Sequence, residues 1–286
     1  MTAGSAWVRL FDQTMAELKF DVDGELLTLE PTLNCMLSPD ENVRKSGATA
    51  LAATLEQHLP LFAHITNTLA KDKEISDNWR GFADIADARH LSNQVEREVV
   101  DALVDAVTNA YPRLSHRYYA LKAKWFGKDQ LNHWDRNAPL PRAPERIIGW
   151  DEARAMVLDA YSGFTPKMAS IAGDFFDNGW IDAPVREGKV PGAFAHPTTP
   201  SAHPYVLLNY QGRPRDVMTL AHELGHGVHQ VLAAPHGALM APTPLTVAET
   251  ASVFGEMLTF RKLLAGADDA RERTSMLASK VCLLYT

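Results

Sequence analysis

The sequence predicts a mostly α-helical protein that carries one or two small β elements. Apolar residues recur three and four positions apart along most of the chain, which is the spacing of a buried helix face. The best strand candidate is the short apolar run Tyr205–Tyr210, directly before another helical pattern. With 286 residues, of which 46% are hydrophobic, the chain can bury a core as one large or two moderate domains.

The N-terminal elements are a helix and a hairpin. Trp7, Leu10 and Phe11 begin a helical pattern over residues 5–18. Asp23-Gly24 lies between two apolar runs, and this pair is typical of a tight hairpin turn, so strands are expected on either side.

Two consecutive helices are expected next. Ser38-Pro39-Asp40-Glu41 has the pattern of a helix start with Ser38 as the N-cap and proline in the first turn. The first helix is expected to reach about Leu59, where Pro60 interrupts it, and the second to reach about Lys71.

The middle of the chain continues as helices separated by polar or proline-rich breaks. Ser92 is expected to cap one helix, whose apolar face includes Val95, Val99, Leu103 and Val107. The remaining expected segments are a helical stretch over 113–126, a loop from Asn137 to Pro144, a helix from Asp151, and a helix from Thr165-Pro166 to about Asn178-Gly179.

The composition changes after Gly188. Five proline or glycine positions interrupt residues 189–204, and this stretch is either a solvated connector or the wall of a substrate cleft. The strand candidate Tyr205–Tyr210 follows it. A helix is then expected from Val217 to about Leu232, with Asp216 as its cap.

Bulk properties exclude several classes of partner. The net charge is −7 without a clustered Lys/Arg stripe, which argues against nucleic acid as the main partner. The N-terminus does not resemble a secretory signal, and no apolar stretch approaches the length that spans a bilayer, so no membrane partner is expected. The two cysteines, Cys35 and Cys282, are far apart, which favours a reducing cytoplasmic location.

The pentad His222-Glu223-Leu224-Gly225-His226 carries the chemical information. Two histidines four positions apart lie on the same face of a helix, where both imidazoles can hold one zinc ion. A glutamate beside them can act as general base, which is the arrangement of a zinc peptidase. A glycine at position 225, inside the helix, lowers helix stability. Its presence is explained if another backbone or a ligand must come close to the helix at this position.

A catalytic zinc needs a third protein ligand. The metzincin pattern is excluded because this chain has His229 and Leu232 where glycine and histidine would be required. A following helical segment offers Glu249 and Glu256. We expect Glu249 to be the ligand and Glu256 to be a partner that orients a histidine. The remaining nearby histidines are expected to be ordinary cleft or surface residues, namely His196, His203, His229 and His236.

These residues resemble a known family. The pentad together with Ala248-Glu249-Thr250-Ala251-Ser252-Val253-Phe254-Gly255-Glu256 is similar to the thimet oligopeptidase family, and most similar to its bacterial oligoendopeptidase F branch. The run from Gly192-Ala193-Phe194 to Asn209-Tyr210 also resembles that branch. The resemblance implies a mostly α, zincin-like (gluzincin) helical metallopeptidase with a deep channel, a small β element beside the active-site helix, and short peptides as substrates.

The resemblance also implies that parts of the enzyme lie outside this sequence. Family members are longer at both ends, and their C-terminal helices carry His and Tyr residues without a counterpart here. The expected organisation is a truncated catalytic portion over 1–286, divided into a helical region at 1–188 and a metal-site region at 189–286.

The expected function is therefore zinc-dependent endopeptidase activity on short peptides. One Zn²⁺ per chain would be held by His222, His226 and Glu249, with Glu223 as the base that activates water. The peptide is expected to pair with a strand edge formed by Gly192, Ala193, Phe194 and Ala195. The alternatives are a zinc aminopeptidase and an inactive peptide-binding or scaffold fragment.

Overall fold

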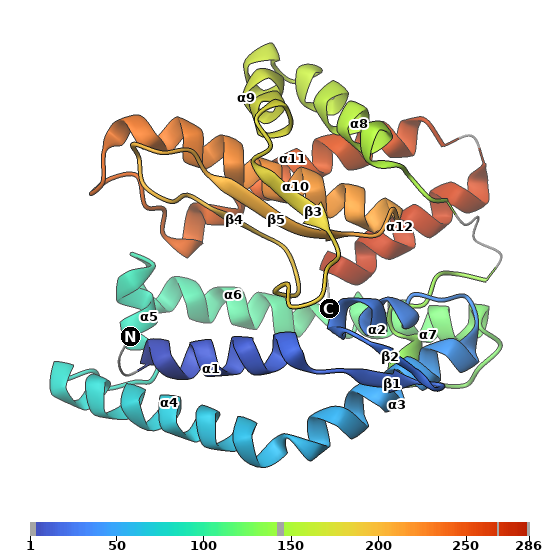
Figure 1. Ribbon diagram of the computed structural model, residues 1–286, viewed down its shortest axis with the longest axis horizontal. Helices are drawn as coiled ribbons and strands as arrows, with labels where there is room; N and C mark the ends of the chain where they lie inside the picture. Colours follow the sequence, from blue (N-terminus) through green and yellow to red (C-terminus); the bar gives the residue numbers. More distant parts are fainter. Residues whose placement is uncertain (1–3, 142–145, 268, 285–286) are drawn as a thin grey trace. The chain divides into compact units, whose positions relative to one another are not determined.

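The computed structural model describes residues 4–141, 146–267 and 269–284, and the chain forms two compact units (Figure 1). One unit contains Met1–Ala143, Glu187–Pro191 and Thr274–Thr286, and the other contains Pro144–Arg186 and Gly192–Arg273. Helices dominate both units, so the predicted mostly α fold class is confirmed.

Apart from the end of α12, the helices and strands of the first unit occur within its long N-terminal segment. They are α1 (Gly4–Glu17), β1 (Phe20–Val22), β2 (Glu25–Leu27), α2 (Leu29–Cys35), α3 (Glu41–Gln57), α4 (Leu59–Arg80), α5 (Asp87–Ser92), α6 (Arg97–Ala110), α7 (Ser115–Trp125) and the short 3-10 helix η1 (His133–Asp135).

The second unit contains the sheet and the predicted site. Its elements are α8 (Trp150–Ser162), α9 (Pro166–Asp177), β3 (Ile181–Pro184), β4 (Phe194–His196), β5 (Tyr205–Tyr210), α10 (Pro214–Ala233), η2 (Ala234–His236) and α11 (Leu245–Ala265), and α12 (Ala270–Leu284) starts in this unit and ends in the other.

The hairpin forms as the sequence predicts. Phe20 pairs with Leu27 and Val22 with Glu25 in an antiparallel ladder. Asp23 and Gly24 both have positive φ, at 53° and 92°, which is the backbone that a tight two-residue hairpin turn requires. Phe20 is fully buried and packs in a small core with residues of α3.

Three predicted helix boundaries are wrong. Asp40, rather than Ser38, caps α3, because its carboxylate accepts the Asn42 N–H at 2.8 Å while the Ser38 hydroxyl accepts the N–H of Asp40 itself. Ser92 ends α5 instead of starting a helix. The helix after Pro60 continues past Lys71 to Arg80, where Gly81 stops it at a φ of 73°.

A buried charge network fastens the first unit. The Arg44 guanidinium and the Asp135 carboxylate are fully buried and lie 2.7 Å apart. Lys128 Nζ contacts the other Asp135 oxygen at 2.7 Å. Arg44 also donates to the carbonyls of Ser38 and Pro39, so the loop before α3 is tied to η1 across 91 positions of sequence.

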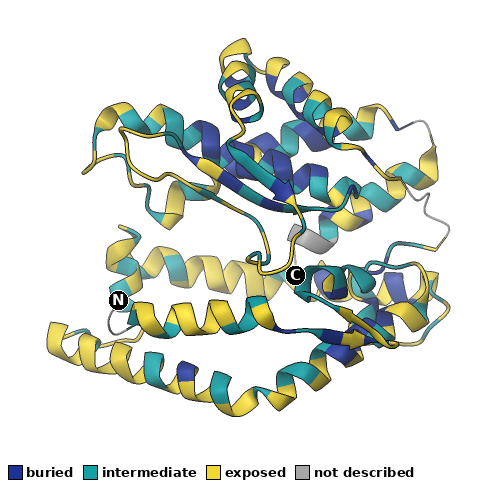
Figure 2. Ribbon diagram, in the orientation of Figure 1, coloured by how far each residue is buried: buried dark blue, intermediate teal, exposed yellow. Residues whose placement is uncertain are grey.

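In the second unit, α10 is the central helix. The sheet has the order β3-β5-β4, with β3 parallel and β4 antiparallel to β5. One side of α10 packs on β4 and β5, and other sides contact α8, α9 and α11 (Figures 1 and 2). Its buried apolar residues join the main core, namely Val217, Leu220, Ala221, Leu224 and Val228.

The start of α10 differs by a few residues from the prediction. The helix begins at Pro214, and Asp216 occupies its first turn. The Asp216 carboxylate accepts the N–H groups of Gln211 and Arg213, at 2.9 and 3.0 Å. Asp216 therefore fixes the turn between β5 and α10 from inside the helix, where a carboxylate also interacts favourably with the helix dipole.

None of the helices in the described part of the chain is long and apolar enough to cross a membrane. The Cys35 side chain is half-buried, and its Sγ lies 3.5 Å from the carbonyl oxygen of Pro31. The side chain of Cys282 lies outside the described residues.

Candidate metal centre

His222 and His226 project from the same face of α10, one turn apart. Their ring centroids are 4.9 Å apart, and both side chains are partly exposed. The helix that carries them is held by its fully buried apolar residues on the opposite side. The prediction that the two imidazoles lie together is confirmed by this geometry.

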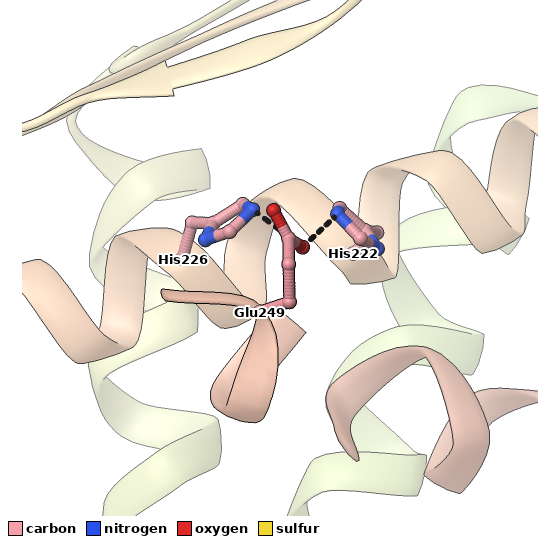
Figure 3. Close-up of side chains that lie close together, drawn as sticks. All are labelled: His222, His226 and Glu249. Atoms are coloured by element: carbon pink, nitrogen blue, oxygen red, sulfur yellow. Dashed lines mark ion pairs between the residues drawn. The ribbon is translucent and has the colours of Figure 1, made fainter. Parts of the chain in front are cut away.

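Glu249 reaches the two histidines from α11. One of its carboxylate oxygens, Oε2, lies 3.1 Å from His222 Nε2 and 3.3 Å from His226 Nε2 (Figure 3). One donor atom from each of the three residues lies within 4.8 Å of the others. Among the described residues they are the group that could hold a metal ion.

The donor set fits zinc. Two histidines and one glutamate are a ligand set of catalytic zinc sites. Zinc bonds to such atoms are about 2.0–2.1 Å long, so two ligand atoms at neighbouring corners of a tetrahedron are about 3.3 Å apart. The two measured separations between the Glu249 oxygen and the imidazole nitrogens agree with this value. The Glu249 side chain is 57% exposed.

Each of these three side chains has a further partner. Glu256 lies two turns along α11 from Glu249. Its Oε2 is 3.2 Å from His222 Nδ1, and its side chain is only 13% exposed. His226 forms a hydrogen bond with the backbone of Ala248. The Ser252 hydroxyl donates to the Glu249 carboxylate at 2.7 Å. These contacts fix ring orientation and carboxylate position, as in zinc sites whose ligands are themselves hydrogen-bonded.

The two imidazoles have different proton affinities. Burial lowers the pKa of His226, and this effect outweighs the nearby Glu249 carboxylate. Burial also acts to lower the pKa of His222, but the hydrogen bond to Glu256 and the charges of Glu223 and Glu249 raise it overall. The neutral ring that a metal requires is thus favoured at His226, whereas His222 is surrounded by carboxylates that attract positive charge.

Glu223 is buried beside this centre. Burial raises its pKa, and the negative charge of Glu249 adds to the effect, while His222 and a hydrogen bond from the backbone of Ala195 oppose it. A carboxyl group whose pKa is raised holds a proton more readily than an ordinary glutamate, which suits a group that accepts and releases protons.

Glycines allow close contacts around the site: Gly225 lets α10 approach α11, and Gly255 lets α11 approach Tyr161 of α8. A Cβ at Gly225 would lie 2.6 Å from the carbonyl oxygen of Ala251. A Cβ at Gly255 would collide with the buried ring of Tyr161, whose hydroxyl donates to the Ala221 carbonyl of α10. The expectation that another backbone comes close to Gly225 is confirmed.

The segment predicted to bind peptide lies beside Glu223. Phe194 and Ala195 belong to β4, which pairs with β5 on one side only. Gly192 precedes the strand with a φ of 83°, and its carbonyl accepts from Asn209 at 2.9 Å. Ala193 packs against the main core, and Phe194 is 42% exposed.

The other histidines are placed in local structure. His203 stacks on Trp180 with ring centroids 4.0 Å apart, His196 accepts the Thr198 N–H at 3.0 Å, and His236 lies in η2. His229 is 3.5 Å from the Thr243 hydroxyl. Sequence reasoning missed Ser252, Ala248 and Tyr161. Only Ser252 had a signal, because it lies three positions, about one helical turn, after Glu249.

The chain is similar to known peptidases. Residues 166–281 match Peptidase family M3. Oligopeptidase PepF of Bacillus subtilis is 28% identical over 273 residues, covering 93% of this chain and 40% of that protein. The chromosomal oligoendopeptidase F of Lactococcus lactis subsp. cremoris is 27% identical over 243 residues, covering 85% of this chain and 40% of that protein. The resemblance inferred from the sequence is confirmed.

The fold is shared with solved structures. The structure of PZ peptidase A with an inhibitor superposes with a TM-score of 0.85 at 16% identity, covering 98% of this chain and 51% of that one. The chain therefore shares the predominantly helical fold of this peptidase structure. The chain spans about 40% of the length of the curated relatives it matches.

Proposed function

We propose that this chain, a relative of the M3 oligoendopeptidases, carries the zinc site and the general base of an endopeptidase that cleaves internal bonds of short peptides. One observation carries the proposal: His222, His226 and Glu249 bring three donor atoms within 4.8 Å of one another, beside a buried Glu223. The names of the relatives, oligopeptidase and oligoendopeptidase, support the substrate class.

In this proposal the three ligands hold one zinc ion. A zinc ion in such a site supplies Lewis acidity, which polarises a carbonyl group and makes a water molecule more acidic. Glu256 and the backbone of Ala248 contact the imidazole rings of His222 and His226, and these contacts would orient the rings for holding the ion.

Glu223 moves the proton. Its carboxylate takes a proton from the attacking water and later delivers it to the leaving amine. The raised pKa of Glu223 suits both steps, because the group can hold the proton between them. Its burial also keeps bulk water from competing for that proton.

The proposed peptide position is the edge of β4. Antiparallel pairing uses one side of β4 for β5, and an extended peptide would add along the other side, pairing at the residues before Ala195, because the outward backbone groups of Ala195 itself contact Glu223 and Gln230. Gly192, Ala193, Phe194 and Ala195 would line this position, immediately beside the base. A cytoplasmic location, suggested by the widely spaced cysteines, is part of the same proposal.

The test is cleavage of a short, internally quenched peptide by zinc-loaded protein. Glu223→Gln preserves shape and removes the base, so it should lower kcat by at least about a hundredfold. Glu98→Gln, the same change at an exposed position of α6, should leave kcat unchanged.

The cleavage products separate the alternatives. Internal fragments that disappear with Glu223→Gln support an endopeptidase. Release of single N-terminal residues would support an aminopeptidase instead. Zinc-loaded protein that binds the peptide and leaves it intact would contradict the proposed activity and favour a binding or scaffold role.

A further inference from the structure

The edge of β4 is already contacted by α10 at one residue. Ala195 pairs with Val206 of β5, but the Val206 N–H donates to the carbonyl of Trp180 on the opposite side, at 2.9 Å. In an antiparallel ladder, residues that do not exchange hydrogen bonds with each other direct their N–H and C=O groups outward. Both backbone groups of Ala195 therefore face the outer edge.

Two side chains of α10 meet these outward groups. The Ala195 backbone hydrogen bonds with the Glu223 carboxylate. The Ala195 carbonyl accepts from Gln230 Nε2 at 3.3 Å. Glu223 and Gln230 are seven positions apart, so they lie two turns apart on the same face of the helix. One strand residue is thus held from two points of the helix that carries the base.

Only the nitrogen of the Gln230 side-chain amide forms a hydrogen bond among the described residues. Its Oε1 is buried without a hydrogen-bond partner in the described part of the chain. A buried unpaired oxygen costs free energy, so a leucine would serve packing better at this position. The amide is explained by its Nε2 donor, which hydrogen-bonds to the Ala195 carbonyl. An oxygen in the place of Nε2 would be repelled by that carbonyl.

We propose that Gln230 is a positioning residue that acts through Ala195 to hold Glu223 in place. By fixing the Ala195 carbonyl, Gln230 keeps the N–H of the same residue directed at the Glu223 carboxylate. The Glu223 carboxylate then has one orientation rather than several. A group that transfers protons to a bound peptide requires such a fixed orientation. The role rests on the proposed function.

The first readout is independent of activity. Hydrogen exchange of the Ala195 amide, measured in the metal-free protein, reports whether the strand edge is held. Gln230→Leu keeps the bulk, and Gln230→Glu keeps the shape and polarity, but both remove the donor. We expect either variant to speed Ala195 exchange about tenfold, consistent with the loss of one hydrogen bond. Gln57→Leu, at an exposed position of α3, is the matched control and should not change it.

The second readout is steady-state cleavage of the quenched peptide. We expect kcat to fall about tenfold with little change in KM and equal zinc content, since the base is displaced while the metal ligands are not. A purely structural role would make Gln230→Glu behave like the wild type. Unchanged Ala195 exchange in folded Gln230→Leu and Gln230→Glu would overturn the inference, as would unchanged kcat. If the wild type does not cleave peptides, the proposed function fails, and the exchange measurement still decides whether Gln230 holds the strand.

Discussion

Gly225 of α10 lies directly against the backbone of Ser252 in α11: a Cβ at Gly225 would be 2.6 Å from Ser252 Cα. Ser252 is also the residue whose hydroxyl donates to the Glu249 carboxylate. The absence of a side chain at Gly225 therefore sets how close Glu249 comes to His222 and His226.

Gly225→Ala should push the helices apart. Because the clashing atoms belong to backbone, we expect a loss of about 1–3 kcal/mol in the free energy of unfolding and a weaker zinc affinity. Denaturant unfolding and competition with a chelator measure the two effects. Gly173→Ala is the control, since nothing lies within 4 Å of a Cβ there and alanine favours a helix. Normal zinc affinity in Gly225→Ala would contradict this account of the helix contact.

Glu256→Ala should weaken metal binding without removing a ligand. The Glu256 carboxylate, 3.2 Å from His222 Nδ1, orients the imidazole ring. Loss of such a partner lowers metal affinity by roughly 10–100-fold. Zinc competition titrations measure the change, with Glu98→Ala as the exposed control. An affinity equal to that of the wild type would show that His222 needs no such partner.

Zinc should stabilise the folded chain. A ligand that binds only the folded state adds about 4 kcal/mol when its free concentration is a thousand times its Kd. Thermal unfolding with zinc and with a chelator should therefore differ by several degrees in the wild type and not in Glu249→Ala. An equal shift in both proteins would place the ion elsewhere.

Asp135 should make the first unit sensitive to acid. Burial acts to raise the pKa of Asp135, but hydrogen bonds from Lys128 and Arg44 outweigh it and hold the pKa below 3.8. The folded state thus binds fewer protons than the unfolded state. The associated stability is complete above the ordinary pKa of 3.8 and is lost as the pH falls through the lower folded value.

Asp135→Asn should remove this acid dependence and destabilise the protein at neutral pH. Arg44 would be left buried without its full counter-charge, and breaking such a pair costs roughly 3–5 kcal/mol. Urea unfolding at several pH values measures both effects. Asp129→Asn changes an exposed carboxylate six positions away and should behave like the wild type. A variant with unchanged stability at neutral pH would show that the network is not stabilising.

Local patterns predicted the elements that depend on neighbouring residues. The Asp23-Gly24 turn, the strand at Tyr205–Tyr210 and the pentad helix all formed because turn chemistry and periodicity are local properties. Ser38 and Asp216 were misplaced as caps, since which of several adjacent oxygens accepts an N–H depends on the exact path of the loop.

The site was predictable as far as spacing determines it. The i, i+4 spacing places His222 beside His226, and a two-turn separation places Glu256 on the same face of α11 as Glu249. The links from Ala195 to Glu223 and Gln230 were not, because they depend on the register of β4 against β5 and on how the sheet packs on α10. Neither is encoded by a short sequence pattern.

The central claim is that His222, His226 and Glu249 hold one zinc ion. Its most direct test is the zinc content per chain after exhaustive dialysis, compared among the wild type, Glu249→Ala and Glu223→Gln. We predict one zinc in the wild type and in Glu223→Gln, and almost none in Glu249→Ala. Retention of a full zinc equivalent by Glu249→Ala, or its loss from Glu223→Gln, would contradict the assignment of ligands and base.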